Sequence, residues 1–188
     1  MTEKVKEGEM MFARGQIDEA RTIFQQVLND APDCVEALNN LGVIAVQQGD
    51  FNAGRQHIGR VLELRPNFLP ALGNLAVIHR HDQNWPGVVE CLEPAIQQDA
   101  ANIAILNLLG LAYLRCERFD DARTTLAKSL EAQPAQPTIR ETLEAIDGFQ
   151  ASDAEQTITL NSLEEEPALP GEPTAPAVPV QFGRPANN

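Results

Sequence analysis

Histidine and cysteine are the residues of this chain that could hold a metal ion or act in catalysis. His79 and His81 lie two residues apart, whereas two histidines that chelate a metal from one helix face stand four apart. The three cysteines form no Cys-x-x-Cys pair and no even set: Cys34, Cys91 and Cys116. The glycine-rich phosphate loop and the Gly-x-Ser-x-Gly and His-Glu-x-x-His motifs are also missing. We therefore expect no enzyme, no metal site and no cofactor.

Composition excludes further classes of partner. The 188 residues carry a formal net charge of -13, which opposes binding to nucleic acid or to an anionic membrane surface. No stretch approaches the roughly 18 apolar residues that a membrane-spanning helix needs, so no membrane insertion is expected. The N-terminus mixes charges and lacks the apolar core of a secretion signal. These features, with cysteines that read as reduced thiols, predict a cytoplasmic protein.

An internal repeat organises the elements of the chain, because four segments align without a gap at an offset of 34 residues. Small residues recur in two columns, and a larger apolar residue recurs in a third. The first column is Gly8, Gly42, Ala76 and Gly110; the second is Ala20, Gly54, Val88 and Ala122; the third is Phe24, Ile58, Leu92 and Leu126. Within each segment, apolar residues at helical spacing stand on both sides of a break such as Gly49-Asp50. Each segment therefore predicts two helices, which approach closely where the side chains are small.

The segments resemble the tetratricopeptide repeat, whose pattern WxxLGxxY appears as LNNLGVIA in the second segment and as LNLLGLAY in the fourth. The resemblance implies an all-α, right-handed superhelical solenoid over residues 1–149. Its four helix-turn-helix repeats would be 1–34, 35–68, 69–102 and 103–136, and a C-terminal capping helix would follow at 137–149. The charged Lys4 and Glu7 stand in columns that are leucine elsewhere, so we expect the first repeat to begin the array.

The third segment departs from the pattern in its turn and in its second helix. Gln83-Asn84 replaces the usual glycine turn, and Pro94 lies inside the second helix, where it removes a hydrogen bond and weakens the helix. Gly87 should weaken the same helix further. Two interpretations stay open: neutral drift in a tolerant outer helix, or a bend that changes the curvature of the groove.

Residues 150–188 form an acidic, proline-rich tail that cannot bury a core and is expected to be disordered. Five prolines fall at every third residue, the period of a polyproline II helix: Pro167, Pro170, Pro173, Pro176 and Pro179. A stiff spacer and a docking site for a proline-reading domain both fit this pattern. The apolar and acidic stretch with Ile158, Leu160 and Leu163 is a second candidate recognition element.

In the family that the sequence resembles, a concave groove lined by the first helices usually receives a peptide or a partner helix. That geometry implies the following lining residues: Val5, Glu9, Phe12, Asn39, Asn40, Val43, Val46, Asn74, Val77, Arg80, Asn107, Leu108, Leu111, Leu114 and Arg115. Asparagine amides can bond a peptide backbone, or they can serve helix packing instead. Arg80 and Arg115 favour a ligand that pairs an apolar anchor with an acidic residue.

The sequence thus predicts a protein-protein interaction scaffold or adaptor that binds a short segment of a partner in its groove. Two alternatives remain open at this point. The chain could be a non-catalytic accessory subunit of an enzyme complex, or an adaptor whose own tail occupies the groove. Self-association is compatible with each of them.

Overall fold

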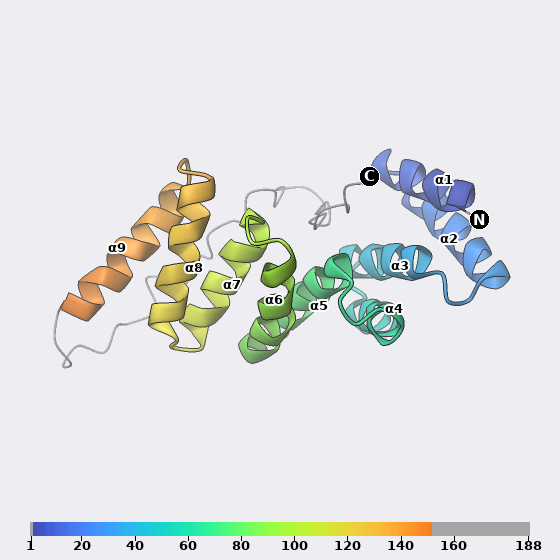
Figure 1. Ribbon diagram of the computed structural model, residues 1–188. Helices are drawn as coiled ribbons and strands as arrows, with labels where there is room; N and C mark the ends of the chain where they lie inside the picture. Colours follow the sequence, from blue (N-terminus) through green and yellow to red (C-terminus); the bar gives the residue numbers. More distant parts are fainter. Residues whose placement is uncertain (1, 152–188) are drawn as a thin grey trace.

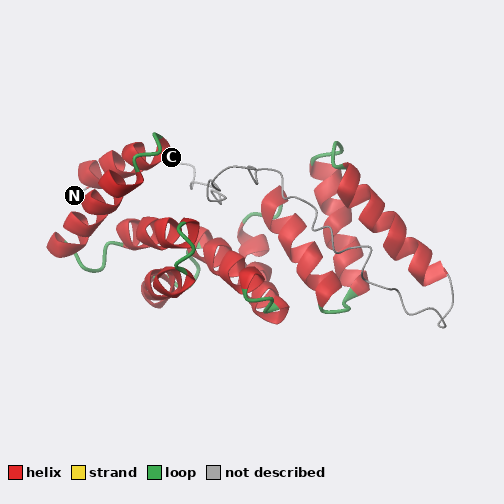
Figure 2. Ribbon diagram, turned by 180° about the vertical axis from the view of Figure 1, so that it is seen from behind, coloured by secondary structure: helices red, strands yellow, loops and turns green. Residues whose placement is uncertain are grey.

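A computed structural model describes residues 2–151 of the chain, and all regular structure in that range is α-helical. The helices follow one another in antiparallel pairs joined by short turns (Figures 1 and 2). Their bounds are α1 Thr2–Ala13, α2 Ile17–Asp30, α3 Val35–Gln47, α4 Phe51–Leu64, α5 Leu69–His81, α6 Trp85–Gln98, α7 Ile103–Arg115, α8 Phe119–Ala132 and α9 Pro137–Ala151. Each helix packs against the next in sequence, which builds a solenoid. The predicted all-α solenoid of four helix pairs and an added C-terminal helix is confirmed.

We call α1, α3, α5 and α7 the A helices and α2, α4, α6 and α8 the B helices. The two ends of the solenoid rise above its middle in Figure 1, so the molecule is bent. Small residues allow the two helices of a pair to approach closely. A Cβ atom at Gly8 would lie 2.6 Å from Phe24 Cε1, and one at Gly42 would lie 2.7 Å from Ile58 Cγ1. The small columns predicted from the sequence are therefore contacts between A and B helices.

The core continues along the solenoid as three clusters of buried apolar residues. The first joins α1–α3 around Phe24 and Ile44, the second joins α3–α5 around Ile58 and Ile78, and the third extends from α5 to α9. Because every cluster draws on more than one pair, the pairs stabilise one another as expected for stacked repeats.

The turn inside each pair needs one residue with a positive φ angle, and that residue stands in a 34-residue column. Gly15 and Gly49 occupy it with φ of 79° and 78°, whereas Gln83 and Glu117 occupy it with φ of 56° and 59°. The sequence predicted an altered turn in the third segment only. The fourth segment also lacks glycine at this position. The backbone of Gln83 and Glu117 has a left-handed conformation, which costs about 1–2 kcal/mol for a residue other than glycine.

Gln83→Gly and Glu117→Gly should therefore each stabilise the fold. Removing the left-handed strain outweighs the extra flexibility of glycine in the unfolded chain, so we expect each change to raise the free energy of unfolding by about 1 kcal/mol. Thermal unfolding followed by circular dichroism measures this effect. Gly49→Ala is the matched change in the opposite direction and should lower the unfolding midpoint. A lower midpoint for both glycine variants would contradict the backbone strain assigned to Gln83 and Glu117.

The third pair keeps a continuous second helix despite Pro94, because α6 extends from Trp85 to Gln98 through the proline. Gly87 has a packing reason that the sequence reasoning missed. A Cβ atom there would lie 2.6 Å from Asn84 Nδ2 and 2.8 Å from His79 Nδ1. Glycine at this position lets α6 pass close to the imidazole of α5.

The two ends of the described solenoid differ. Ile139 and Ile146 of α9 are buried in the third core cluster, while Arg140, Glu141 and Glu144 of the same helix are exposed. At the other end Lys4 and Glu7 are exposed, and the ammonium of Lys4 lies 3.4 Å from the carboxylate of Asp30.

The predicted polyproline pattern and the stretch with Ile158, Leu160 and Leu163 lie outside the described residues. The division of the chain at residues 149 and 150 stays a prediction.

Candidate functional site

The A helices carry the predicted groove, and in α3, α5 and α7 two faces are already covered. One face packs against the preceding pair: Leu41 and Ile44 of α3 belong to the same core cluster as Phe24 of α2. A second face packs against the B helix of the same pair, because a Cβ atom at Gly54 of α4 would lie 2.7 Å from Val46 Cγ2 of α3. In these three helices only the remaining face can meet a ligand.

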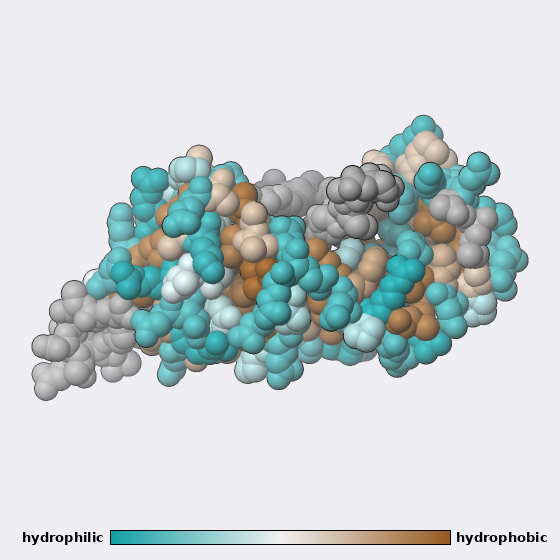
Figure 3. All heavy atoms as spheres, viewed as in Figure 1, coloured by the Kyte–Doolittle hydropathy of each residue, from teal (hydrophilic) through white to brown (hydrophobic). Residues whose placement is uncertain are grey.

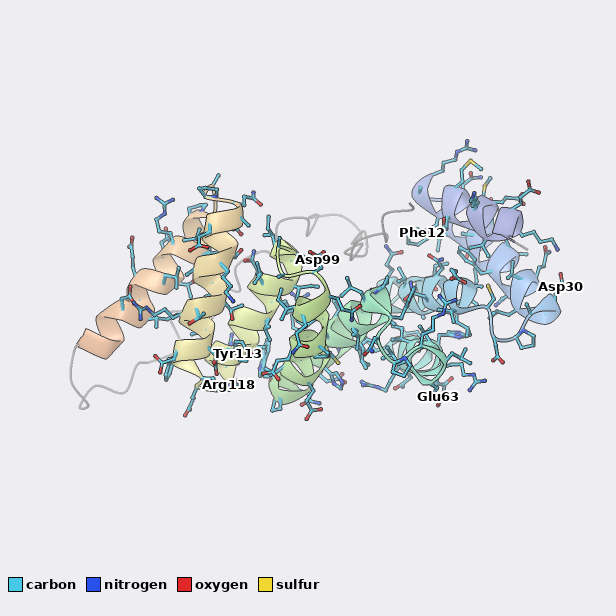
Figure 4. The ribbon with its side chains drawn as sticks, in the orientation of Figure 1. Phe12, Asp30, Glu63, Asp99, Tyr113 and Arg118 are labelled. Carbon is cyan, nitrogen blue, oxygen red and sulfur yellow. The ribbon has the colours of Figure 1, made fainter. Side chains whose placement is uncertain are left out.

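The apolar members of one column of predicted lining residues belong to none of the three core clusters. This column consists of Glu9, Val43, Val77 and Leu111, one from each A helix. Val77 and Leu111 are half-buried, and Val43 is 7% exposed. Figure 4 shows Phe12 on the side of the solenoid above α3, whereas Glu63 of α4 lies on the opposite side. We call the column Glu9, Val43, Val77 and Leu111 the groove column.

The asparagines, for which peptide binding and helix packing were both open, have partners inside the protein. Asn74 Nδ2 donates to Asn39 Oδ1 at 3.1 Å, which joins α5 to α3, and Asn74 is only 8% exposed. Asn40 Nδ2 donates to the backbone oxygen of Glu36 at 2.8 Å within α3. The helix-packing interpretation therefore describes the contacts of these amides.

Asn107 is the clearest departure from the predicted lining, because it is buried in a polar network between α7, α8 and the start of α9. Asn107 Nδ2 donates to Gln136 Oε1 at 2.8 Å, and Ser129 Oγ donates to Asn107 Oδ1 at 2.5 Å. Gln136 Nε2 in turn donates to Ser129 O and Ser129 Oγ, each at 3.0 Å. With exposures of 3%, 0% and 7%, Asn107, Ser129 and Gln136 hold α9 onto the last pair and offer nothing to a ligand.

Sequence reasoning missed Ser129 and Gln136. The signal for Ser129 was available, since its column is otherwise apolar: Val27, Val61 and Ala95. A hydroxyl in an apolar column indicates a polar partner nearby, because a buried hydroxyl without one is costly.

Several other predicted lining residues belong to the core instead of the open surface. Leu108, Leu114 and Val5 are 1%, 5% and 8% exposed, and they pack within the core clusters. The columns that contain Asn39 and Asn74 lie where successive A helices meet, because Asn74 of α5 bonds Asn39 of α3. Phe12, Val46 and Leu114 pack within or against core clusters, and Phe12 and Val46 are half-buried there.

Basic and aromatic side chains border the groove column toward the third and fourth pairs. The guanidinium of Arg115 lies 5.4 Å from the centre of the Trp85 ring, a cation-π contact that links α7 to α6. Arg80 is half-buried on α5, and the ring of His81 stacks on Phe51 with 3.5 Å between ring centres. On the face drawn in Figure 3, hydrophobic atoms reach the surface in patches between hydrophilic ones. Arg80 and Arg115 thus stand about one helical turn from Val77 and Leu111 on the same helices.

The groups that could do chemistry are engaged in packing. Burial raises the pKa of the Cys91 thiol to about 11, so it stays protonated and unreactive near neutral pH. Burial, with a hydrogen bond to Glu93, raises the pKa of Tyr113 to about 12. The Arg118 guanidinium covers the Tyr113 ring at 4.4 Å, and Figure 4 shows the two side by side.

Within residues 2–151 no cluster of three metal-ligating side chains occurs, and no helix there is long and apolar enough to cross a bilayer.

His79 is held in its neutral form by its surroundings. Burial is the largest cause that lowers its pKa, and the charge of the nearby Arg55 lowers it further. The carboxylates of Asp82 and Glu90 act in the opposite direction but do not offset these effects. Asn84 Oδ1 accepts from the Gly87 N–H, so Asn84 Nδ2, 3.1 Å from His79 Nδ1, is the donor of that pair. A proton on Nδ1 would break this bond.

Acidification should therefore destabilise the fold as the pH falls through 6.5. The pKa of His79 is lower in the folded state than in the unfolded one, so the unfolded chain takes up the proton first. Burial also lowers the pKa of His57, against the charge of Asp50, and acts in the same direction. The unfolding midpoint should drop between pH 7 and pH 5, and His79→Gln together with His57→Gln should flatten that drop. An equal slope in the double variant would show that other groups cause it.

Comparison with known proteins agrees with this architecture. The tetratricopeptide-repeat family matches the chain over residues 11–78 and 83–146. A BBSome complex member BBS4 homolog from Drosophila melanogaster is 25% identical over 122 residues, which are 65% of this chain and 25% of that protein. The chain thus spans about a quarter of that relative.

Solved structures of MamA have the same fold. MamA from Desulfovibrio magneticus RS-1 superimposes with a TM-score of 0.69 at 20% identity, covering 79% of this chain and 86% of that one. MamA AMB-1 superimposes with a TM-score of 0.70 at 20% identity, covering 80% and 82%. The matched family spans both halves of the solenoid, and the chain therefore belongs to the tetratricopeptide-repeat family.

Proposed function

We propose that this chain is a cytoplasmic, non-catalytic adaptor that binds a short segment of a partner protein along the groove column. Tetratricopeptide-repeat proteins are protein-interaction scaffolds, and both the family match and the MamA-like fold support that general role. The finer proposal is supported by the strip formed by Val77 and Leu111, which are half-buried and belong to none of the core clusters. An apolar strip of this kind gains free energy when a partner covers it.

The charges beside the strip define the ligand further. Arg115 and Arg80 lie beside its later half, while Glu9 occupies the groove column at its first position. A segment with an apolar anchor over Val77 and Leu111 and an acidic residue toward α5 and α7 fits this distribution, since opposite charges at an interface orient the partner. Asn74 and Asn107 contribute little to this recognition, because their amides form hydrogen bonds within the protein.

Affinity purification with the full chain tests the proposal. The bound protein should contain a segment of the stated chemistry that binds as a synthetic peptide. An adaptor recovers a partner without catalytic activity of its own, whereas recovery of an enzyme would favour the accessory-subunit alternative. A chain lacking residues 151–188 should bind the same peptide more tightly if the tail competes for the groove, and equally well if the tail is a spacer.

A further inference from the structure

Each B helix carries an apolar residue of one column near its end, and two of these residues bridge successive core clusters. Leu28 of α2 packs against the core clusters on both sides of α3, and Leu62 of α4 packs against the clusters on both sides of α5. Ile96 and Leu130 stand in the same 34-residue column and also pack against the core. Each of α3, α5, α7 and α9 thus follows a B helix that carries a leucine or isoleucine at this position.

The leucine or isoleucine of each B helix faces a stripe of three positions on the helix that follows it. In α3 it is Ala37, Leu41 and Ile44; in α9 it is Ile139, Leu143 and Ile146, and all of these are buried or packed against the core. The same positions in α1 are Glu3, Glu7 and Met10, and none of them is covered. Met10 is 46% exposed, the one large hydrophobic side chain so exposed in the described range.

A hollow of about 550 Å³ opens at this end of the solenoid, between α1 and α2. Its lining is Glu7, Met11, Asp18, Glu19, Thr22 and Ile23. Met11 and Ile23 are the half-buried apolar members of the lining, whereas the three carboxylates are exposed. Asp18 already has Arg21 at 3.4 Å, and Glu7 and Glu19 add two further negative charges. We call this surface the α1–α2 end hollow.

We propose that the α1–α2 end hollow binds an amphipathic helix of a second protein, which places a leucine or isoleucine over Met11 and Ile23 and lysines or arginines against Glu7, Asp18 and Glu19. The hollow shares Glu7 with the exposed stripe of α1, and Leu28 and Leu62 show the kind of side chain that packs against the clusters containing this stripe in later pairs. The carboxylates then select basic flanking residues, because like charges across an interface oppose binding. This surface is separate from the groove column, so the chain would hold two partners at once.

The charges disfavour a second copy of this chain as the occupant. The exposed face of α9 presents Glu141, Glu144 and Asp147 with only Arg140 among them, and these acids would face the carboxylates of the hollow.

The test uses the full chain and a fluorescent helical peptide of about 18 residues with leucines on one face and lysines beside them. Its binding is followed by anisotropy at physiological salt. Glu7→Lys with Glu19→Lys should weaken binding roughly tenfold or more, and Ile23→Glu should do the same by removing the apolar contact. The matched control, Glu141→Lys with Glu144→Lys on α9, changes the net charge equally and should alter binding less than about twofold. Bound peptide should also slow peroxide oxidation of Met10 and Met11.

Three results would overturn the proposal. Equal weakening by both charge-reversal pairs would mean that the peptide responds only to the overall acidity of the protein. Loss of peptide binding in Leu111→Glu would place the peptide in the groove, which leaves the proposed function intact and removes this second site. Concentration-dependent self-association in sedimentation, abolished by Glu7→Lys with Glu19→Lys, would identify a second copy as the occupant.

Discussion

Replacing Asn107 by leucine should lower the free energy of unfolding by about 3 kcal/mol, the largest stability effect that we expect from a single change here. The substitution removes the acceptor of the Ser129 hydroxyl and the donor to Gln136 Oε1, and both groups are buried. A buried polar group that loses its partner costs about 1–3 kcal/mol, and two are affected. The thermal midpoint should fall by roughly 6–12 °C for a chain of this size.

Two comparisons separate the network from other effects of the substitution. Asn40→Leu makes the same change on an A helix at a half-buried amide that bonds only a helix carbonyl, and it should cost less than about 1 kcal/mol. Replacing the whole network at once, by Asn107→Leu, Ser129→Ala and Gln136→Leu, should recover most of the loss, since apolar replacement of both partners is nearly neutral. If Asn107→Leu costs no more than Asn40→Leu, the network does not hold α9 in place.

Leu111→Glu should weaken binding of the groove ligand about a hundredfold or more while leaving the helical content unchanged. The carboxylate would be buried against an apolar anchor without a partner, which costs several kcal/mol. The fold should tolerate the change because Glu9 already stands at the same position of α1. Thr124→Glu adds the same charge at an exposed position of α8 and is the control for long-range repulsion. Titration calorimetry with the partner peptide measures both variants, and equal affinities would contradict the groove as the site.

The fold could be predicted from the sequence because the 34-residue period determines both helices of every pair at once. Gly8 and Gly42 indicated close helix contacts, and the contacts with Phe24 and Ile58 confirm them. The strained turn at Glu117 was visible only by aligning it with Gly15 and Gly49, since glutamate itself carries no turn signal.

The lining of the site was less predictable, because a column describes only the average surroundings of a residue. Asn107 acquires its role from Ser129 and Gln136, which follow it by 22 and 29 residues and differ from their own columns. Leu108 and Leu114 are apolar residues on the correct helix, yet packing against neighbouring helices buries them. Periodicity assigns a residue to a helix face, and only the contacts decide whether that face is open.

Photo-crosslinking from the groove column tests the central claim most directly. A photoreactive residue at position 77 of the full chain, in place of Val77, should form a covalent product with the partner peptide, and Leu111→Glu in the same chain should abolish that product. The same photoreactive residue at position 56, in place of the exposed Gln56 on α4, should give none. Crosslinking from position 56 and not from position 77 would place the partner on the B helices and contradict the account.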